Sequence, residues 1–457
     1  MTMEATSASP TAANAGASTS EAEEWASSRP PLSPMAKSRY VDSSDVTESG
    51  NRRSLRRRLA TSPSANERTI GDVRLVVRRS AASTAPRLDG YGERVSEPSR
   101  ERVEAALAPH LGGARIVAMR AETIGTGQMS ESRRLHLEYD GATGPATIVA
   151  KFPSLDPTSR TTGRAVRGYE IEARFYRDLR PHLGAEAPRC WHAWRDEETD
   201  DFLLLLEDLA PCRQGDQLTG CTLAEAEAAV DALAGLHAPL WGSPELAATT
   251  WLARSAPEER GRTQALLARL WPGFLERYRE RAGEEVARVG AALVDDPGDY
   301  FTAELPSRTL VHGDYRLDNL LFVEAPPPTG SDAATERPAR GGVLAARVVD
   351  FQTLSHGCGV QDLSYFLGAG LVPETRRAHE SALVARWREV LAARGVETDG
   401  DEVWHWYRRY AVAGIIMSVV ASMIVKRTER GDEMFLAMAR RHARHALDVD
   451  ALGALRP

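Results

Sequence analysis

Hydrophobic and polar positions along the first half of the folded region follow the spacing of short strands. Short segments rich in apolar and β-branched residues at 115–124, 132–139 and 146–151 predict three β-strands. A continuous apolar run follows at 201–211 and ends in a turn marked by Pro211, the pattern of a buried strand. These four segments predict a β-rich N-terminal part.

Helical spacing dominates the rest of the chain. A first helix is expected just after Pro98, because a stripe of apolar residues at helical spacing begins at Val103. A second helix is predicted over 222–237, where Thr222 followed by Glu225 forms a capping-box signature. Amphipathic helical patterns then cover 257–290 and about 374–455. The C-terminal part is therefore expected to be helical.

A strand, a tight loop and a strand are predicted over 310–322, with polar residues confined to the loop. Asp314 and Asn319 lie five residues apart in this loop, so the turn can bring both toward one point. Asp350 ends another apolar, β-branched run and supplies a second carboxylate. Such oxygen ligands suit Mg²⁺. The alternative is a β-hairpin whose polar loop makes only local Asx-turns.

Composition places the chain among ordinary globular proteins. The chain has 457 residues, is 42% hydrophobic and 26% charged, and carries a formal net charge of -7, which gives no argument for a nucleic-acid or acidic-membrane partner. Its four cysteines show no metal-ligand spacing and are too few for a disulfide framework, so a reducing cytoplasm fits. The most apolar stretch, 411–425, is interrupted by Gly414, Ser418 and Ser422 and predicts a buried helix rather than a membrane span.

Two segments lack the periodicity of folded elements. Residues 1–95 are rich in Ser, Ala, Thr and Pro and are expected to be a disordered tail, with a possible short strand at 72–77. The basic cluster at 52–58 is interpreted as a solvated charge run, the alternative being an arm for nucleic acid or an anionic surface. Residues 325–342 predict a flexible surface insertion between two strands of a hairpin.

Several motifs together resemble one enzyme family. His312-Gly-Asp-x₄-Asn, followed by the strand-end Asp350-Phe, resembles the catalytic core of aminoglycoside phosphotransferases and choline kinases, relatives of the protein kinases. Gly-x-Gly-x-Met, Glu-Ala-Arg-Phe-Tyr, Leu-Glu-Asp-Leu and Gly-Asp-Gln, spread over about 115–450, resemble the ecdysteroid-kinase-like branch. The resemblance implies a two-lobed, protein-kinase-like α+β fold with a nucleotide-binding lobe at 96–208, a catalytic lobe at 209–457, and ATP in the cleft.

The resemblance also implies residues that bind the nucleotide. Lys151 is expected to hold the phosphates of ATP, fixed by Glu172, with Glu170 as the less favoured alternative. Glycines in a loop let the backbone approach a phosphate closely, and adenine is expected to bond to backbone groups of the hinge between the lobes. The residues implied are Gly125 and Gly127 for the phosphates, and Glu207 and Leu209 for the hinge.

The same resemblance assigns roles around the central loop. Asp314 would accept the proton of the substrate hydroxyl, and His312 would support the loop by hydrogen bonds. Asn319 and Asp350 would hold Mg²⁺, and Asp362 would tie the next helix to the loop. His237 is interpreted as a structural histidine rather than a ligand-binding one.

These assignments predict ATP-dependent phosphoryl transfer to a hydroxylated small molecule. The segment from Val403 to Thr428 has no Asp or Glu and is rich in aromatic residues and methionine, which favours a largely apolar, uncharged, sterol-like or polyketide-like alcohol. The alternative is that most of these side chains belong to the core of the lobe. An antibiotic phosphotransferase, acting on an aminoglycoside or macrolide, is the main alternative. A protein kinase is disfavoured because an Ala-Pro-Glu motif and a long activation segment are missing. A non-catalytic nucleotide-binding protein remains a hypothesis of another class.

Overall fold

The structure is a computed structural model, and it describes most of the chain beyond residue 96. The residues described are 67–70, 73–76, 97–125, 129–141, 144–254, 257–306, 308–325 and 343–456. Most of the expected tail and insertion, including the basic cluster at 52–58, lies outside them. Within the tail, strands β1 (Glu67–Ile70) and β2 (Val73–Val76) pair antiparallel.

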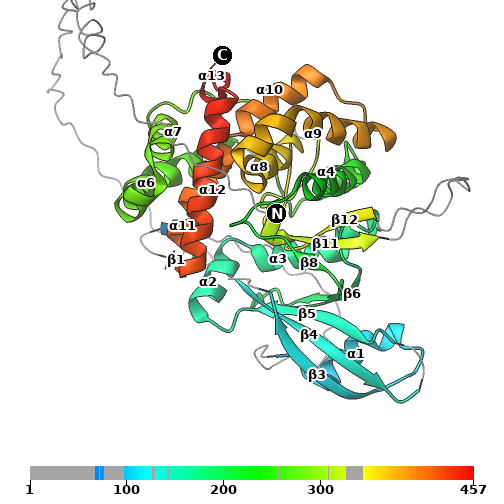
Figure 1. Cartoon of the computed structure of the whole chain (residues 1–457). Helices are drawn as coiled ribbons and strands as arrows, with labels where there is room; N and C mark the ends of the chain where they lie inside the picture. Colours follow the sequence, from blue (N-terminus) through cyan, green and yellow to red (C-terminus); the bar gives the residue numbers. More distant parts are fainter. Residues whose placement is uncertain are drawn as a thin grey trace, which may run out of the picture. The chain divides into compact units, whose positions relative to one another are not determined.

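The N-terminal part is built on an antiparallel sheet of five strands in the order β3-β4-β5-β7-β6 (Figure 1). All four strands predicted from the sequence are present, with ends shifted by a few residues. Their bounds are β3 Ile116–Ile124, β4 Ser130–Tyr139, β5 Thr147–Pro153, β6 Cys190–Arg195 and β7 Phe202–Glu207.

Side chains of β7 enter two different cores because successive residues of a strand point to opposite faces. Leu203 and Leu205 join the cluster formed with α1 (Arg100–Leu107), where Val103 and Leu107 are fully buried. Phe202, Leu204 and Leu206 join the main core of the protein. Because both faces of β7 are buried, its sequence is a continuous apolar run rather than an alternating one.

Helix α1 begins at Arg100, close to the start expected near Pro98. Ser99 is its N-cap, and the Ser99 hydroxyl accepts a hydrogen bond from the backbone N–H of Arg102 at 3.3 Å. A serine oxygen satisfies one of the N–H groups that have no partner in the first turn.

Two helices cross the main-core face of the sheet before β6. They are α2 (Pro157–Ala165) and α3 (Gly168–Arg174), and α3 continues as a π-helical turn over Phe175–Leu179. Phe175 stacks on Phe351 with ring centroids 3.9 Å apart. Since Phe351 follows Asp350, this stacking sets the position of Asp350 relative to α3.

The C-terminal part is helical, as predicted (Figure 1). Thr222 caps α4 and makes the predicted capping box with Glu225. The bounds of the helices are α4 Leu223–His237, α5 Pro244–Ala248, α6 Pro257–Ala282, α7 Glu284–Asp295, α8 Val360–Gly370, α9 Pro373–Ala393, α10 Gly400–Tyr410, α11 Ala413–Ile424, α12 Glu429–Asp448 and α13 Ala451–Ala454. The predicted two-lobed, kinase-like α+β class is thereby confirmed.

Two small three-stranded sheets carry the central loop. Strand β10 (Thr309–Val311) pairs with β13 (Ser355–Gly357), which also pairs with β9 (Ala253–Arg254). Strand β11 (Leu320–Ala325) pairs with β12 (Val343–Val348) and β8 (Arg213–Gln214). The loop thus joins two different sheets instead of closing a hairpin, whereas the hairpin predicted across 325–342 is formed by β11 and β12.

One stretch is long and apolar enough to cross a membrane by length and composition. It spans Gly400–Ile424, and 61% of its most apolar window is buried inside the protein. The bulk of α11 faces the main core, where Ile415 and Val419 are fully buried. The stretch therefore has the packing expected of a core helix.

Candidate active site

Lys151 lies between two carboxylates that come from distant parts of the chain. Its ammonium nitrogen Nζ is 2.8 Å from Glu172 Oε1 and 2.9 Å from Asp350 Oδ1. Glu172 is on α3, and its Oε1 also accepts the backbone N–H of Phe351 at 3.2 Å. One glutamate oxygen therefore holds both the lysine and the chain segment that carries Asp350.

Electrostatic coupling decides the charge states of this cluster. Burial by itself lowers the pKa of Lys151, but the carboxylates of Asp350 and Glu172 outweigh it and raise the pKa. Burial raises the pKa of Asp350, yet the Lys151 ammonium outweighs burial and the pKa falls. Burial dominates at Glu172, whose pKa is raised. Lys151 is therefore charged and aligned at neutral pH.

Glu172, and not Glu170, makes the ion pair with Lys151. Glu170 instead pairs with Arg167 at 2.9 Å and Arg174 at 3.3 Å near the protein surface. The two glutamates point in different directions because residues two apart lie on different faces of a helix. The contact expected of Glu172 is present, while its role in turnover stays a prediction.

The central loop turns sharply at Gly313, which has a φ of +80°. A Cβ atom at this position would lie 2.5 Å from the backbone oxygen of Thr353, so only glycine fits. The turn aims two consecutive N–H groups at Asp362: His312 N lies 2.6 Å from Oδ2 and Gly313 N lies 2.9 Å from Oδ1. Asp362 is almost fully buried on α8, so it ties that helix to the loop as the sequence predicted.

His312 uses both ring nitrogens within the protein. Nδ1 lies 3.3 Å from the backbone N of Asp314, which has only a hydrogen to give, so Nδ1 accepts. Nε2 then carries the proton and donates to the carbonyl oxygen of Val349 at 3.2 Å. This arrangement supports the loop and links it to the segment before Asp350, which agrees with a positioning rather than a proton-transferring histidine.

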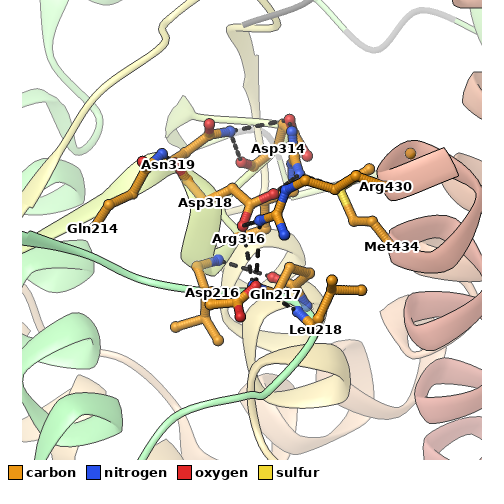
Figure 2. A network of polar contacts seen from close by, with 12 residues as sticks. Gln214, Asp216, Gln217, Leu218, Asp314, Arg316, Asp318, Asn319, Arg430 and Met434 are labelled. Atoms are coloured by element: carbon orange, nitrogen blue, oxygen red, sulfur yellow. Dashed lines mark hydrogen bonds and ion pairs between the residues drawn. The ribbon is translucent and has the colours of Figure 1, made fainter. Parts of the chain in front are cut away.

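Asp314 is held by three side chains. Its Oδ2 accepts from Arg316 Nε and from Asn319 Nδ2, each at 3.0 Å (Figure 2). Its Oδ1 accepts from the hydroxyl of Tyr365 at 3.0 Å. A carboxylate offers about four lone-pair sites, two on each oxygen. Oδ2 is thus fully engaged, and Oδ1 keeps room for one more donor.

A second layer of polar contacts fixes Arg316. Its Nη1 donates to Asp318 Oδ2 at 2.9 Å, and Asp318 Oδ1 in turn accepts from Gln217 N at 3.0 Å (Figure 2). Arg430 on α12 reaches the same carboxylate oxygen at 3.3 Å. The loop is therefore braced by the segment after β8 and by α12 before any ligand binds.

Two oxygen atoms near this loop suit a divalent cation. The carbonyl oxygen of Asn319 accepts the backbone N–H of Val349 at 3.0 Å, which places Asn319 beside Asp350. In the part of the chain that the structure describes, Asn319 Oδ1 and Asp350 Oδ2 have no hydrogen-bond partner. An amide oxygen and a carboxylate oxygen are the hard ligands that Mg²⁺ prefers. The described residues contain no cluster of three or more His, Cys, Asp or Glu side chains placed to bind a metal.

The residues expected to contact the rest of a nucleotide lie at the ends of strands. Gly125 follows β3 with a φ of +75°, whereas Gly127 lies outside the described residues. At the end of β7 the backbone N–H of Glu207 is already bonded to the carbonyl oxygen of Arg189 at 2.8 Å. Leu209 follows Asp208, which Arg134 of β4 holds by two hydrogen bonds. The N–H of Glu207 is therefore already engaged, and the parts expected of Glu207 and Leu209 in binding adenine stay predictions.

Comparison with known families agrees with this geometry. Residues 130–330 match the model of the phosphotransferase enzyme family. The match includes Lys151, Glu172, Asp314 and Asn319 and ends before Asp350. No curated protein sequence matches the chain.

Solved structures of similar fold include three kinases of small molecules. The GDP and kanamycin complex of the aminoglycoside phosphotransferase APH(2″)-IIIa is 14% identical, with a TM-score of 0.44, and the match covers 74% of this chain and 97% of that one. Choline kinase LicA from Streptococcus pneumoniae is 13% identical, with a TM-score of 0.38 and coverage of 72% and 94%. Ethanolamine kinase from Plasmodium vivax is 8% identical, with a TM-score of 0.41 and coverage of 71% and 82%.

Two residues of the candidate site were not identified in the sequence analysis. Arg316 lies inside the central loop, and its place two residues after Asp314 is a local signal that could have identified it. Tyr365 lies on α8, 51 residues from Asp314, and its side chain reaches Asp314 Oδ1 only because Asp362 fixes α8 against the loop. The spacing of residues along the sequence does not predict a contact of this kind.

A cavity of about 240 Å³ lies among the helices of the C-terminal part. Its walls come from α10, α11, the start of α8, the first turns of α6 and the segment at 300–305. Trp406, Tyr410 and Met417 line it, as the aromatic and methionine content of 403–428 predicted. Ile415 and Tyr407, from the same segment, are instead fully buried in the core.

Proposed function

We propose that the protein transfers the γ-phosphoryl group of ATP to the hydroxyl of a small molecule. The observation that carries this proposal is the junction between Asn319 and Asp350. The backbone N–H of Val349 donates to the carbonyl oxygen of Asn319 at 3.0 Å, which holds Asp350 next to the loop of Asp314. Asp350 in turn contacts Lys151, which is paired with Glu172. Groups suited to hold phosphates, a cation and an acceptor hydroxyl thus meet in one place. Phosphoryl transfer needs little beyond such placement and charge neutralisation.

Each group has a defined part in the proposed reaction. Lys151, fixed by Glu172, binds the phosphates of ATP as a point charge. The acceptor hydroxyl donates to Asp314 Oδ1, which is the carboxylate oxygen with a lone pair to spare, and its proton passes to Asp314 as the new oxygen–phosphorus bond forms. The bond between the γ-phosphorus and the bridging oxygen breaks, and ADP leaves with that oxygen.

Asn319 and Asp350 are the side chains proposed to hold Mg²⁺. When bound, such an ion neutralises the charge that the phosphate oxygens carry. Asp350 has a φ of +69°, a conformation that costs little for Asp but that places its carboxylate toward Lys151. The stacking of Phe351 on Phe175 helps to hold this conformation.

The proposed acceptor is a largely apolar alcohol, as for the ecdysteroid-kinase-like branch that the motifs resemble. The cavity lined by Trp406, Tyr410 and Met417 supports this proposal, because aromatic and thioether side chains favour apolar ligands. The two charged side chains in its wall are Arg260 and Arg409, and cationic walls repel a polycation. An aminoglycoside is therefore the less favoured acceptor. The four cysteines are free thiols, which agrees with the proposed cytoplasmic location.

A turnover panel tests the proposed function. The full chain is incubated with ATP, Mg²⁺ and one alcohol at a time, drawn from neutral sterols, macrolides, hydroxy acids and cationic aminoglycosides, and phosphorylated products are detected by mass spectrometry. We expect a product with a +80 Da shift for apolar alcohols and none for aminoglycosides. Efficient turnover of the aminoglycosides alone would establish the antibiotic phosphotransferase instead. ATP binding with no phosphorylated product from any alcohol would favour the non-catalytic alternative.

A further inference from the structure

Arg260 brings a guanidinium group to the wall of the apolar cavity. Its Nε and Nη1 atoms are buried, and neither meets a hydrogen-bond acceptor among the described residues. Arg260 lies in the first turn of α6 and lines the cavity together with Trp406, Ile416 and Met417. A buried charge normally has a partner, because the cost of removing it from water is otherwise not recovered.

Arg409, which lines the same cavity, has hydrogen-bond acceptors for its guanidinium group. Arg409 donates to Asp299 Oδ1 at 2.5 Å and to the backbone oxygen of Ala454 at 2.7 Å. Asp299 is thereby engaged by Arg409, so the cavity wall keeps one positive charge in excess at Arg260. The N-terminal end of α6 adds to it, because the dipole of a helix favours a negative charge near its first turn.

A second donor without a partner lines the same cavity. The side chain of Tyr410 is only 3% exposed, and its hydroxyl meets no hydrogen-bond partner in the part of the chain that is described. Arg260, Tyr300 and Tyr410 line the same cavity, and the ring centroids of the two tyrosines are 6.3 Å apart. A carboxylate can accept hydrogen bonds from both a guanidinium group and a phenol hydroxyl.

The cavity is coupled to the proposed catalytic carboxylate through α8. Gln361 lines the cavity, and Tyr365, which donates to Asp314 Oδ1, lies four residues later on the same face of the helix. One turn of helix separates these positions by about 6 Å along the axis. Met417 of the cavity also packs against the cluster of Tyr365 and Met434. The cavity wall at Gln361 is thus one helical turn from the residue whose hydroxyl contacts Asp314 Oδ1.

We propose that this cavity binds an amphipathic hydroxy acid. Its carboxylate accepts hydrogen bonds from Arg260 and Tyr410, its hydrocarbon segment lies along Trp406, Ile416 and Met417, and its hydroxyl reaches Asp314. The part about the hydroxyl rests on the proposed function, whereas the part about the carboxylate does not. The proposal replaces the uncharged alcohol expected from the sequence with an apolar alcohol that carries one negative charge.

Binding of a simple fatty acid tests the carboxylate site without any turnover. Dissociation constants of octanoate and methyl octanoate are measured by calorimetry with the full chain, with Arg260→Met and with Arg262→Met. The last variant is the matched control, because Arg262 is an exposed arginine on the same helix. We expect the parent and R262M to bind octanoate about ten- to a hundredfold more tightly than the ester, as for a buried hydrogen bond to a charged group. R260M should bind the two alike, and Tyr410→Phe should reduce the preference by a factor of about two to ten.

The outcomes separate this inference from the proposed function. Octanoate binding that depends on Arg260 supports the site even if no alcohol is phosphorylated. Equal binding of octanoate and its ester by the parent, or an unchanged preference in R260M, overturns it. In that case phosphorylation of neutral alcohols would still support the proposed kinase function. With 8-hydroxyoctanoate as acceptor, R260M is expected to raise KM about tenfold or more while kcat changes little, because Arg260 lies away from the reacting oxygen.

Discussion

Arg316 donates from Nε to Asp314 Oδ2 over 3.0 Å, two residues along the same loop. The same guanidinium reaches Asp318 from Nη1, so it lies between two carboxylates. Burial acts to lower the pKa of Arg316, but the charges of Asp314 and Asp318 outweigh it and raise the pKa. The pairing places a positive charge beside Asp314, and together with Asn319 it occupies Asp314 Oδ2. Oδ1, beside the Tyr365 hydroxyl, is left to receive the proton of the acceptor.

The pairing of Lys151 with Glu172 predicts different effects for two neighbouring glutamates. Glu172→Gln removes the buried charge that fixes Lys151, so kcat/KM for ATP should fall by at least about tenfold, which corresponds to the loss of a hydrogen bond between charged groups. Glu170→Gln is the matched control, and it should change kcat/KM by less than about twofold because its ion pairs are near the surface. If the two substitutions lowered kcat/KM for ATP equally, the ion pair with Lys151 would not be the cause of the loss.

Asp350 is predicted to couple nucleotide binding to the cation. Asp350→Ala removes one of the two oxygens proposed for Mg²⁺ and also one partner of Lys151. ATP affinity of the parent, measured by calorimetry, is expected to rise with Mg²⁺ concentration, whereas that of D350A should barely respond. Magnesium titrations that coincide for the two proteins would remove Asp350 from the metal site.

Asp362 is predicted to stabilise the central loop through its two hydrogen bonds to backbone N–H groups. Asp362→Asn keeps one acceptor oxygen but turns an NH₂ group toward a backbone donor, so the free energy of unfolding should fall by about 2–3 kcal/mol. Asp231→Asn, which disrupts an exposed ion pair with Arg386, is the control and should cost about 1 kcal/mol or less. Urea denaturation gives both values, and similar losses would contradict the role given to Asp362.

Local patterns predicted those parts of the molecule whose partners are near in the sequence. The Thr222–Glu225 capping box and the antiparallel β11–β12 hairpin follow from neighbouring residues. Glu172 could be placed because Phe175 and Leu179, at helical spacing from it, had to face the core, and both are buried. The π-helical turn over Phe175–Leu179 did not disturb this, since the change begins after Glu172.

Contacts that depend on tertiary packing could not be predicted from the sequence. The strands on either side of the central loop join different sheets because β10 pairs with β13, whereas β11 pairs with β8 and β12. The aromatic content of 403–428 predicted an apolar pocket, but periodicity does not tell a core face from a cavity wall. Tyr407 is in the core and Tyr410 lines the cavity, although both are buried.

Two buried histidines of α12 predict acid sensitivity. Burial, followed by the charges of Arg441 and Arg376, lowers the pKa of His442 from 6.5 to about 3. His445, one turn away, also has a pKa far below its usual value because it is buried. The unfolded chain therefore binds protons that the folded protein does not. Stability is fully present above pH 6.5 and is lost as the pH falls from 6.5 toward 3.

Replacing one of these histidines should flatten that pH dependence. Between pH 7 and pH 5, the free energy of unfolding of His442→Leu is expected to fall by about 2 kcal/mol less than that of the parent, the contribution of one such histidine. Urea denaturation at the two pH values provides the comparison. Parallel losses in parent and variant would show that His442 does not supply the effect.

The central claim is that Asp314 accepts the proton of an acceptor hydroxyl during phosphoryl transfer. The most direct measurement follows radiolabelled γ-phosphate from ATP to the best acceptor of the panel, in a single turnover, with the parent and with Asp314→Asn side by side. Loss of a general base predicts a rate about a hundredfold or more lower in D314N, with the affinity for ATP nearly unchanged. Labelled product formed at the same rate by both proteins would contradict the account.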